Sequence, residues 1–399
     1  MATGSGLLDD GVAARIFDAA PDRRGTHSMK WDMAPGELPM WVADMDFRTA
    51  PVILEALSQR VEHGVFGYTV APDEWFQAII SWWESRHDWT MKKEWIALTT
   101  GVVPAISSLV RSLTAPGDAV VVLMPVYNIF FNSILNSGRV SSPSPITTDE
   151  WGDHIDWNDL ETRLADPHTS MLLFCNPQNP TGHIWESDVL ARIGELCERH
   201  GVIVVSDEIH CDILAPGTYY TPFAAASDAC RDLSVTCLAP TKAFNIAGLQ
   251  TAAIVVPNHD IREKALRGIN RDEVAEPNAF AVDATIAAFE CGGPWLDELR
   301  AYLFANKVHA AEVVSQIPGL RATATPATYL LWIDASELGI DSGKLADLIR
   351  EKTGLILSDG AAFGAGTGSF LRMNVACPRE RLDDGLERLR RAIAAIYAE

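Results

Sequence analysis

The sequence lacks the features that mark several classes of protein. None of its apolar runs reaches the 18 or so consecutive residues that a membrane-spanning helix needs. Residues 1–25 contain no basic region followed by an apolar one, so they do not resemble a secretory signal. We therefore expect a cytoplasmic protein that does not associate with a membrane.

Basic residues are scarce, at 32 Lys and Arg against 53 Asp and Glu, which gives a net charge of -21. Binding to nucleic acid depends on clustered Lys and Arg, so we expect no nucleic-acid partner. The seven cysteines include no C-x-x-C pair, and the ten histidines show no spacing typical of a metal site. We expect reduced, mostly buried thiols and no bound metal.

The sequence is rich in short apolar runs with many β-branched residues. Five of them lie at residues 118–125, 170–177, 201–208, 233–240 and 251–257. The runs are continuous rather than alternating, as in strands that are covered on both faces. A helical pattern fills residues 186–201, where Ser187 or Asp188 can cap the start and Gly201 can end the helix. Strands that alternate with helices predict a largely parallel sheet in an α/β domain.

The last hundred residues differ in pattern. Long helical patterns at 294–317 and 380–399 flank shorter strand candidates at 328–334 and 368–376. This arrangement predicts a second, smaller α+β domain. We place the large α/β domain at 46–285 and the small domain at 286–399, with the N-terminal segment 1–45 joining the small domain.

Polar residues follow three of the predicted strands. Asn176 follows one strand, Asp207 and His210 the next, and Thr241 and Lys242 a third. Each residue alone has an ordinary structural explanation, such as a turn, a helix cap or a solvated surface lysine. In open α/β sheets, however, ligands bind at the carboxyl ends of the strands. Three polar ends in one sheet therefore indicate a site.

The residue types at these ends suit a pyridine cofactor bound as a Schiff base. Such a cofactor needs an amine, an acid beside its ring nitrogen and a donor to its phenolic oxygen. Lys242, Asp207 and Asn176 meet these needs, and a buried Asp207 needs a cationic partner. A phosphate group suits the helix start at Gly101, where free backbone N–H groups and Pro104 are expected.

Longer motifs carry a family resemblance. "NPQNPTG", "SDEIH" and "PTKAFNIAGL" resemble those of pyridoxal 5′-phosphate enzymes of fold type I, the class I/II aminotransferase superfamily, from about residue 28 to the C-terminus. "LPMWVADMDF", "FGYTV", "PVYNIF" and "DEIHCDI" resemble the branch of cystathionine β-lyases and cysteine-S-conjugate β-lyases. The resemblance implies a fold type I architecture with a large, mostly parallel-sheet α/β domain and a smaller α+β domain.

The same resemblance implies roles for individual residues. The catalytic set is Lys242, which forms the aldimine, Asp207, which pairs with the ring nitrogen, and Tyr127, which stacks on the ring. The cofactor-binding set adds Asn176 at the phenolic oxygen, Gly101, Val102, Val103 and Thr241 at the phosphate, His210, and Tyr68 from a second subunit. The substrate-binding set is Arg372 at the α-carboxylate together with Trp41, Asn176 and Tyr68. A homodimer is therefore expected.

Some positions depart from the family pattern. Ala239 and Gln250 stand where a hydroxyl and a basic residue often contact the phosphate, and His210 stands where aminotransferases carry tyrosine. Gln178 and His183 replace the histidine and arginine expected for this branch, so they bear on which substrate is accepted.

The expected reaction is β-elimination. An L-cysteine S-conjugate or cystathionine loses its sulfur through a Lys242 aldimine and a quinonoid, giving a thiol, pyruvate and ammonia. Two alternatives stay open at this point. One is an aminotransferase or a decarboxylating or deaminating enzyme of a natural-product pathway, and the other is a non-catalytic protein on an enzyme fold.

Overall fold

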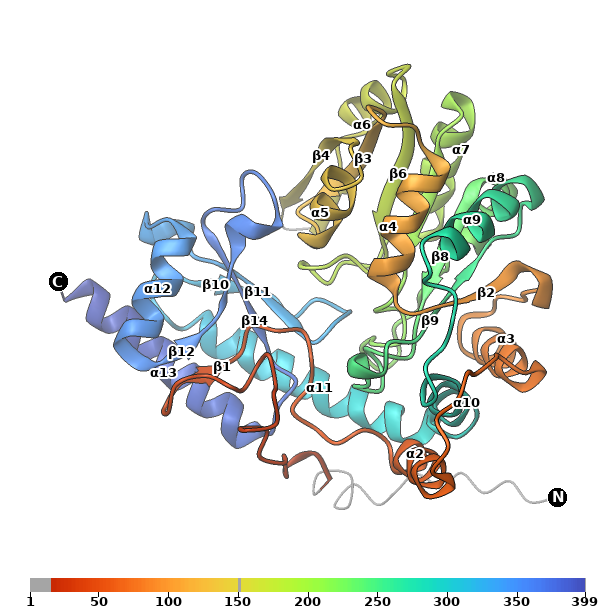
Figure 1. Cartoon of the computed structure of the whole chain (residues 1–399). Helices are drawn as coiled ribbons and strands as arrows, with labels where there is room; N and C mark the ends of the chain where they lie inside the picture. Colours follow the sequence, from red (N-terminus) through yellow and green to blue (C-terminus); the bar gives the residue numbers. More distant parts are fainter. Residues whose placement is uncertain (1–15, 150–151, 399) are drawn as a thin grey trace.

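An eight-stranded sheet forms the centre of the larger part of the molecule (Figure 1). The structure is a computed structural model that describes residues 16–149 and 152–398. In spatial order the strands are β2 (Ile96–Thr99), β9 (Ala252–Val255), β8 (Ser234–Leu238), β7 (Ile203–Asp207), β6 (Thr169–Cys175), β3 (Ala119–Met124), β4 (Val140–Asp149) and β5 (Gly152–Ile155). Neighbours from β8 to β4 pair in parallel, whereas β9 and β5 run antiparallel to their neighbours. The predicted, mostly parallel sheet is confirmed.

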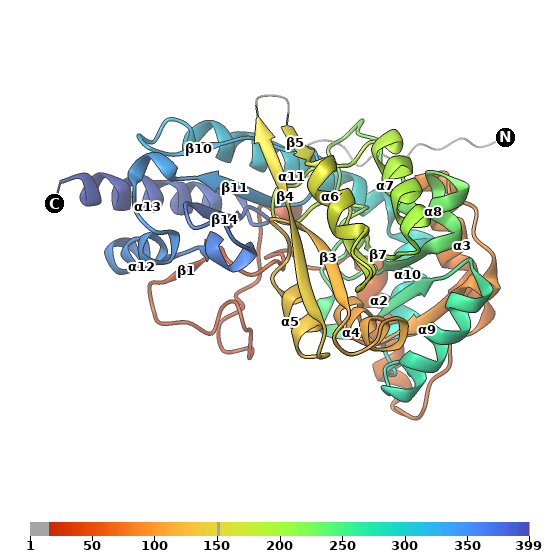
Figure 2. The same ribbon diagram turned by 90° about the horizontal axis from the view of Figure 1, so that it is seen from above.

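Helices cover both faces of this sheet (Figure 2). They are α4 (Val102–Leu113), α5 (Ile129–Leu135), α6 (Trp157–Leu164), α7 (Ser187–His200), α8 (Asp228–Leu233) and α9 (His259–Arg271). Val120 and Val122 of β3 pack in one core with α4, α5 and α9. Val121 and Leu123 pack in a second core with α6 and α7. Because side chains on both faces of β3 meet helices, this strand is apolar at successive positions.

The predicted helix α7 forms, but its start differs from the expectation. The N-cap position is Glu186, and neither Ser187 nor Asp188 caps the helix with its side chain. The helix ends at Gly201, as predicted, with φ of 68° in the left-handed region.

The C-terminal part of the chain builds a second, antiparallel sheet. Its strands are β10 (Arg321–Ala322), β11 (Leu330–Asp334), β14 (Phe370–Asn374) and β13 (Ser358–Asp359), in that spatial order, and a separate parallel pair joins β1 (Leu38–Pro39) to β12 (Leu355–Ile356). Three helices, α11 (Gly293–Val314), α12 (Ser342–Thr353) and α13 (Arg379–Tyr397), accompany these strands. The pairing of β1 with β12 attaches the N-terminal segment to this smaller unit.

One large core joins the two parts of the molecule. It contains residues of α2 (Pro51–His63), α3 (Asp73–His87), α10 (Ala281–Cys291) and α11 together with the small sheet. Short 3-10 helices, η1 (Lys93–Trp95), η2 (Phe223–Ala225), η3 (Ala247–Leu249), η4 (Ser336–Leu338) and η5 (Gly360–Phe363), lie between the longer elements. The domain boundaries at 46 and 286 stay a prediction. Residues 1–15 of the predicted N-terminal segment lie outside the described residues.

Six of the seven cysteine side chains are buried, and all seven are free thiols.

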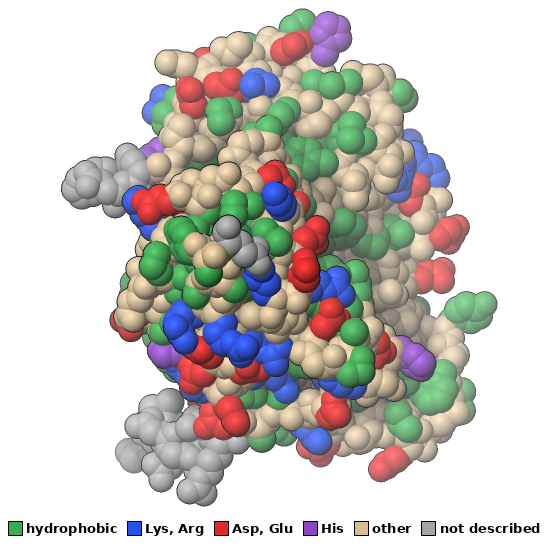
Figure 3. Space-filling model, turned by 90° about the vertical axis from the view of Figure 1, so that its left-hand side faces the viewer, with side chains coloured by type: hydrophobic (Ala, Val, Ile, Leu, Met, Phe, Trp, Pro, Cys, Tyr) green, Lys and Arg blue, Asp and Glu red, His purple; other side chains and the backbone are tan. Residues whose placement is uncertain are grey.

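No helix in the described part of the chain is long and apolar enough to cross a membrane. On the face shown in Figure 3, several Lys and Arg side chains lie side by side, with Asp and Glu side chains next to them. Ion pairs on α13, such as Arg388 Nε–Asp384 Oδ1 at 3.0 Å, illustrate this mixture.

Candidate active site

A cavity of about 670 Å³ lies where the carboxyl ends of the central strands face the small sheet. Lys242, Asp207, Tyr127 and His210 line it from the large sheet and its loops. Arg372 lines it from β14 of the small sheet. The fold thus brings five of the predicted residues to one cavity.

Lys242 lies four residues beyond the end of β8. Its Nζ donates a hydrogen bond to the carbonyl oxygen of Ala43 at 2.6 Å. Burial lowers the pKa of the Lys242 ammonium to about 8, and the nearby positive charge of Arg372 acts in the same direction. Near neutral pH a larger fraction of this amine than of an ordinary lysine is therefore neutral, and so nucleophilic.

Asp207 is the last residue of β7, and its side chain is 4% exposed. Its Oδ1 accepts a hydrogen bond from the backbone N–H of Ile209 at 3.1 Å. Burial raises the pKa of this carboxyl to about 6. Within the described residues no cationic side chain pairs with it directly, so its ionised form needs a cation from a ligand.

Arg372 is 6% exposed, and its guanidinium contacts only neutral groups. Nη1 donates to Oδ1 of Asn179 at 3.1 Å, and Nη2 donates to the carbonyl oxygen of Trp41 at 3.0 Å. No carboxylate in the described part of the chain forms an ion pair with it, and burial lowers its pKa to about 10. A buried cation without a counter-ion at the wall of a cavity is suited to bind an anionic ligand, and the planar guanidinium suits a carboxylate.

The structure corrects the expectation for Asn176. Its Nδ2 donates to the carbonyl oxygen of Thr221 at 3.3 Å, and its Oδ1 accepts from the N–H of Trp185 at 3.4 Å. With both ends of its amide engaged, Asn176 does not line the cavity. Asn179, the second asparagine of the same "NPQNPTG" motif, lines the cavity and contacts Arg372. Asn179 rather than Asn176 is therefore placed to contact a ligand in the cavity.

The start of α4 forms one end of the cavity. Gly101, Val102 and Val103 line it, as does Thr241 from the loop that carries Lys242. The first N–H groups of a helix have no partner within the helix, so they are available to a phosphate. Gln250 also lines this region, whereas Ala239 is a buried core residue outside the lining.

Tyr127, His210 and Trp41 complete the predicted residues that line the cavity. Burial, followed by the charge of Asp207, raises the pKa of Tyr127, so the phenol stays neutral. Burial lowers the pKa of His210 to about 3, and the charges of Lys242 and Arg372 contribute, so the imidazole is neutral.

Three further residues singled out in the sequence lie away from the cavity. Tyr68 is fully exposed, at 103% of its reference area. Gln178 is fully buried, and its Nε2 donates to the carbonyl oxygens of Leu123 and Pro125 at 3.1 and 2.6 Å. His183 packs against Trp185 with ring centroids 4.4 Å apart. Within the chain, neither Gln178 nor His183 contacts the space where a substrate would bind.

An N-terminal strap, residues 41–47, lines the cavity with Trp41, Val42 and Ala43, and it is held by the loop after β8 and by β14 of the small sheet. Asn245, three residues after Lys242, donates to the carbonyl oxygens of Met45 and Phe47 at 3.0 and 2.8 Å. Asn374, on β14, donates to those of Val42 and Asp44 at 2.5 and 2.6 Å. The sequence motif "WVADMDF" therefore folds into a wall of the cavity, and the two asparagines that hold it were not predicted.

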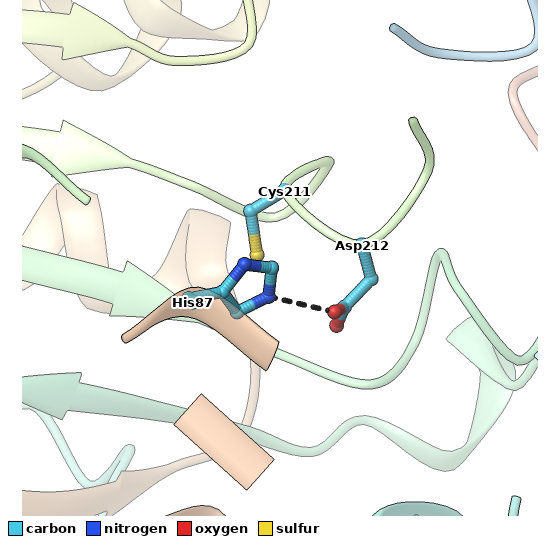
Figure 4. A group of neighbouring side chains, drawn as sticks. All are labelled: His87, Cys211 and Asp212. Atoms are coloured by element: carbon cyan, nitrogen blue, oxygen red, sulfur yellow. Dashed lines mark hydrogen bonds and ion pairs between the residues drawn. The ribbon is translucent and has the colours of Figure 1, made fainter. Parts of the chain in front are cut away.

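A second polar group, outside the cavity lining, lies between the end of α3 and the loop that follows Asp207. Figure 4 shows His87, Cys211 and Asp212, whose possible ligand atoms lie within 4.8 Å of one another. His87 Nε2 and Asp212 Oδ1 lie 2.9 Å apart, and Trp82 Nε1 donates to Asp212 Oδ1 and Oδ2 at 3.0 and 3.1 Å. Because these contacts already engage the carboxylate, we interpret the group as a tie between α3 and the loop that carries His210.

The residues of the cavity fit pyridoxal 5′-phosphate. The free amine of Lys242 suits an aldehyde, the unpaired Asp207 suits a protonated ring nitrogen, and the start of α4 suits a phosphate. Lys242 Nζ contacts a backbone carbonyl rather than a carboxylate, and Asp207 forms no ion pair with any described residue.

Comparison with known proteins supports this assignment. The family model "Aminotransferase class I and II" matches residues 39–389. The cystathionine beta-lyase PatB of Bacillus subtilis is 43% identical over 386 residues, which cover 95% of this chain and 100% of PatB.

Solved structures of similar proteins support the same family assignment. Cystalysin of Treponema denticola, whose structure contains a pyridoxal 5′-phosphate cofactor, superposes with a TM-score of 0.92 at 31% identity, covering 95% of this chain and 99% of cystalysin. The PLP-bound C-S lyase of Staphylococcus hominis gives a TM-score of 0.89 at 31% identity, covering 94% of this chain and 97% of that one. The fold type I architecture and the family resemblance predicted from the motifs are confirmed.

Proposed function

The chain belongs to the class I and II aminotransferase family, and we propose that it is a pyridoxal 5′-phosphate-dependent carbon–sulfur β-lyase that acts on an L-cysteine S-conjugate or cystathionine. One observation carries the proposal. A free amine, an unpaired carboxyl and an unpaired guanidinium, those of Lys242, Asp207 and Arg372, line a single cavity. An amino-acid substrate and the cofactor together supply a partner for each.

In this proposal Lys242 would hold the cofactor covalently, and Asp207 would keep its ring nitrogen protonated. Thr241 and the backbone of Gly101, Val102 and Val103 would receive the phosphate, and Asn179 would be the amide nearest the phenolic oxygen. The aromatic side chain of Tyr127 would suit a position against the ring. When bound, pyridoxal 5′-phosphate supplies an electron-withdrawing ring that stabilises negative charge on the α-carbon of the substrate.

In this proposal Lys242 transfers a proton from the α-carbon of the substrate to the leaving sulfur. With the cofactor bound, the neutral Lys242 amine would remove the proton from the α-carbon of the substrate. The bond between the β-carbon and sulfur then breaks, and the sulfur leaves with the electron pair. The Lys242 ammonium returns its proton to the sulfur, so the thiol leaves neutral. Arg372 holds the α-carboxylate throughout, which fixes the α-carbon near the lysine.

The overall reaction balances as R–S–CH₂–CH(NH₃⁺)–COO⁻ + H₂O → R–SH + CH₃–CO–COO⁻ + NH₄⁺. Water enters when the released 2-aminoacrylate hydrolyses.

The test is to incubate the purified holoenzyme with S-ethyl-L-cysteine and to measure thiol, pyruvate and ammonia. We expect equal amounts of all three. Conversion of the cofactor to pyridoxamine phosphate without thiol release would show transamination instead.

Replacement of Arg372 by lysine is expected to raise KM for S-ethyl-L-cysteine about tenfold to a hundredfold, because a lysine cannot form the paired hydrogen bonds of a guanidinium. The control ligand is S-ethylcysteamine, which lacks the carboxylate. Its dissociation constant, measured from the change in the cofactor spectrum, should be the same within about threefold for both proteins. An equal loss of affinity for both ligands would contradict the role of Arg372.

The lowered pKa of Lys242 predicts how cofactor capture depends on pH. Below about pH 8 the amine is mostly charged and cannot attack an aldehyde, and above it the amine is neutral. The apoprotein and Nα-acetyl-lysine are each mixed with pyridoxal 5′-phosphate in the same buffer, and the rate constant for appearance of the visible band is measured for both. The ratio of the apoprotein's rate constant to that of Nα-acetyl-lysine should therefore be largest near neutral pH. It should fall toward pH 10, because an ordinary lysine keeps gaining neutral amine up to about pH 10.4. A ratio independent of pH would contradict the lowered pKa.

We also propose a homodimer in which Tyr68 completes the site of the partner subunit. Tyr68 belongs to an exposed apolar segment that includes Val61, Val65, Phe66 and Val70, with exposures of 55 to 103%. Large exposed apolar patches are typical of protein interfaces.

The cytoplasmic location of the protein stays a prediction.

A mixed dimer tests the shared site. Tyr68→Phe should weaken cofactor binding about tenfold to a hundredfold, as expected for loss of a hydrogen bond to a charged group. Refolding this variant together with Lys242→Ala at limiting cofactor should restore activity, because mixed dimers contain one intact site. Mixtures that are no more active than the sum of the separate variants, or a monomer by light scattering, would contradict the proposal.

A further inference from the structure

The carbonyl oxygen of Ala43 accepts two hydrogen bonds at the wall of the cavity. Lys242 Nζ donates one at 2.6 Å, and Tyr329 Oη donates the other at 2.9 Å. A carbonyl oxygen has two lone pairs and no proton, so the phenol proton of Tyr329 must point at it. Ala43 lines the cavity, whereas Tyr329 does not. The shared oxygen therefore connects Tyr329, outside the cavity, to Lys242 inside it.

The hydroxyl of Tyr329 is a buried donor. The residue is 1% exposed, and burial, followed by the charge of Asp44, raises the pKa of its phenol. The phenol therefore keeps its proton at neutral pH. The ring packs edge-on against His210, with ring centroids 6.2 Å apart. A phenylalanine at this position would keep the ring packing and lose the hydrogen bond to Ala43.

A strained turn directs Tyr329 toward Ala43. Thr328, the residue before Tyr329, has φ of 65°, in the left-handed region that β-branched residues rarely adopt. Lys307, a fully buried residue of α11, donates through Nζ to the carbonyl oxygens of Ala327 and Thr328 at 2.6 and 3.2 Å. Backbone strain of this kind persists only where the surrounding contacts enforce it. The fold thus fixes the direction in which the Tyr329 side chain points.

The backbone on both sides of Ala43 is also fixed. Nδ2 of Asn374 donates to the carbonyl oxygens of Val42 and Asp44 at 2.5 and 2.6 Å. Of these three successive carbonyl groups, the one of Ala43 is left for Lys242 and Tyr329. Each of these contacts forms within one chain. The Ala43 carbonyl is therefore a fixed acceptor beside the end of the Lys242 side chain.

A fixed acceptor matters because Lys242 must present its nitrogen accurately. The contacts described are those of its free amine, the form that removes the α-proton in the proposed reaction. A lysine has a flexible four-carbon stem, whereas proton transfer requires the nitrogen to lie within reach of the proton that it takes. After the transfer Nζ carries a positive charge, and a carbonyl oxygen that accepts its hydrogen bond stabilises that charge.

We propose that Tyr329 is a positioning residue for this proton transfer: its hydroxyl holds the carbonyl oxygen of Ala43, and this oxygen holds Lys242 Nζ beside the α-carbon of the substrate. The role rests on the proposed β-lyase function, in which Lys242 moves the α-proton. Tyr329 touches neither the substrate nor the cofactor in this proposal. Loss of its hydroxyl should therefore slow proton transfer without weakening substrate binding.

The experiment compares the holoenzyme with its Tyr329→Phe variant on L-norleucine, in which a methylene replaces the sulfur of S-ethyl-L-cysteine. L-norleucine has no leaving group on its β-carbon, so exchange of its α-proton with D₂O, followed by NMR, reports the lysine step alone. The exchange rate constant at saturation should fall about tenfold, since a misplacement of about 1 Å can cost about a hundredfold. The dissociation constant of L-norleucine, measured from the cofactor spectrum, should stay within about threefold.

Three results would overturn the role of Tyr329. One is an exchange rate constant that stays within about twofold in the variant. Another is a dissociation constant that rises as much as the rate constant falls, which indicates general damage to the site. The third is no exchange by the unmodified enzyme with L-norleucine bound. An unmodified enzyme that exchanges this proton but releases no thiol from S-ethyl-L-cysteine would contradict the β-lyase function and leave the role of Tyr329 intact.

Tyr220→Phe is the matched control. Tyr220 is 7% exposed, and its Oη donates to Glu208, outside the residues that line the cavity. This variant also loses one buried hydroxyl, and it should lower thermal stability at least as much as Tyr329→Phe, because its hydrogen bond is to a carboxyl group. Its exchange rate constant should nevertheless stay within about twofold of that of the unmodified enzyme. Equal losses of exchange in the two variants would overturn the positioning role.

Discussion

Replacement of Lys242 by alanine is expected to reduce kcat/KM for S-ethyl-L-cysteine by at least about 10⁴-fold, because the variant loses both the covalent anchor and the group that moves the α-proton. Thiol release measures the loss. The visible band should also disappear, although noncovalent cofactor can remain bound through the phosphate contacts at α4. Added methylamine should restore part of the activity, since a small amine can replace the missing base.

The control for this variant is Lys264→Ala, because Lys264 is an exposed lysine on α9. It should keep both the visible band and the activity within about twofold. Substantial thiol release by Lys242→Ala in the absence of added amine would contradict the mechanism.

Replacement of Asp207 by asparagine is expected to lower kcat by about 10²–10⁴-fold, because a neutral amide cannot hold a proton on the ring nitrogen. The buried carboxyl has a pKa of about 6, and a bound cation should keep it ionised through the working range. The reaction can be followed by thiol release with saturating cofactor, so that weaker binding does not obscure the change in kcat.

Glu208 offers a matched control, since it is also a buried carboxyl and follows Asp207 directly. It accepts hydrogen bonds from Ser206 Oγ at 2.8 Å, from the N–H of Phe223 at 2.9 Å and from Tyr220 Oη. These contacts direct it away from the cavity. Glu208→Gln should therefore lower thermal stability but change kcat less than about tenfold. Equal losses of kcat in the two variants would contradict the special role of Asp207.

The sheet could be predicted from the sequence because its strands are covered on both faces. The run is apolar at every position from 119 to 125, and its successive residues Val120 and Val121 face different helices. The site followed from the same pattern, because the polar residues after parallel strands meet at one edge. Lys242 and Asp207 belong to that edge, and they line the cavity.

Other features depend on contacts that the sequence does not display. Asn176 and Asn179 have similar neighbours in the chain, and only the folded turn shows that Asn179 lies in the cavity. Gln178 was expected to affect the choice of substrate, yet its side chain holds the backbone at Leu123 and Pro125. The carbonyl oxygen of Ala43 meets Lys242 and Tyr329, which are 199 and 286 residues away in the sequence.

The most direct test of the account is to find where the cofactor is attached. The purified holoenzyme is reduced with borohydride, digested and analysed by mass spectrometry, with unreduced protein as the control. We predict that the visible band disappears on reduction and that a pyridoxyl group is found on the peptide containing Lys242. Attachment to a different lysine, or a protein that binds no pyridoxal 5′-phosphate after reconstitution, would contradict the account.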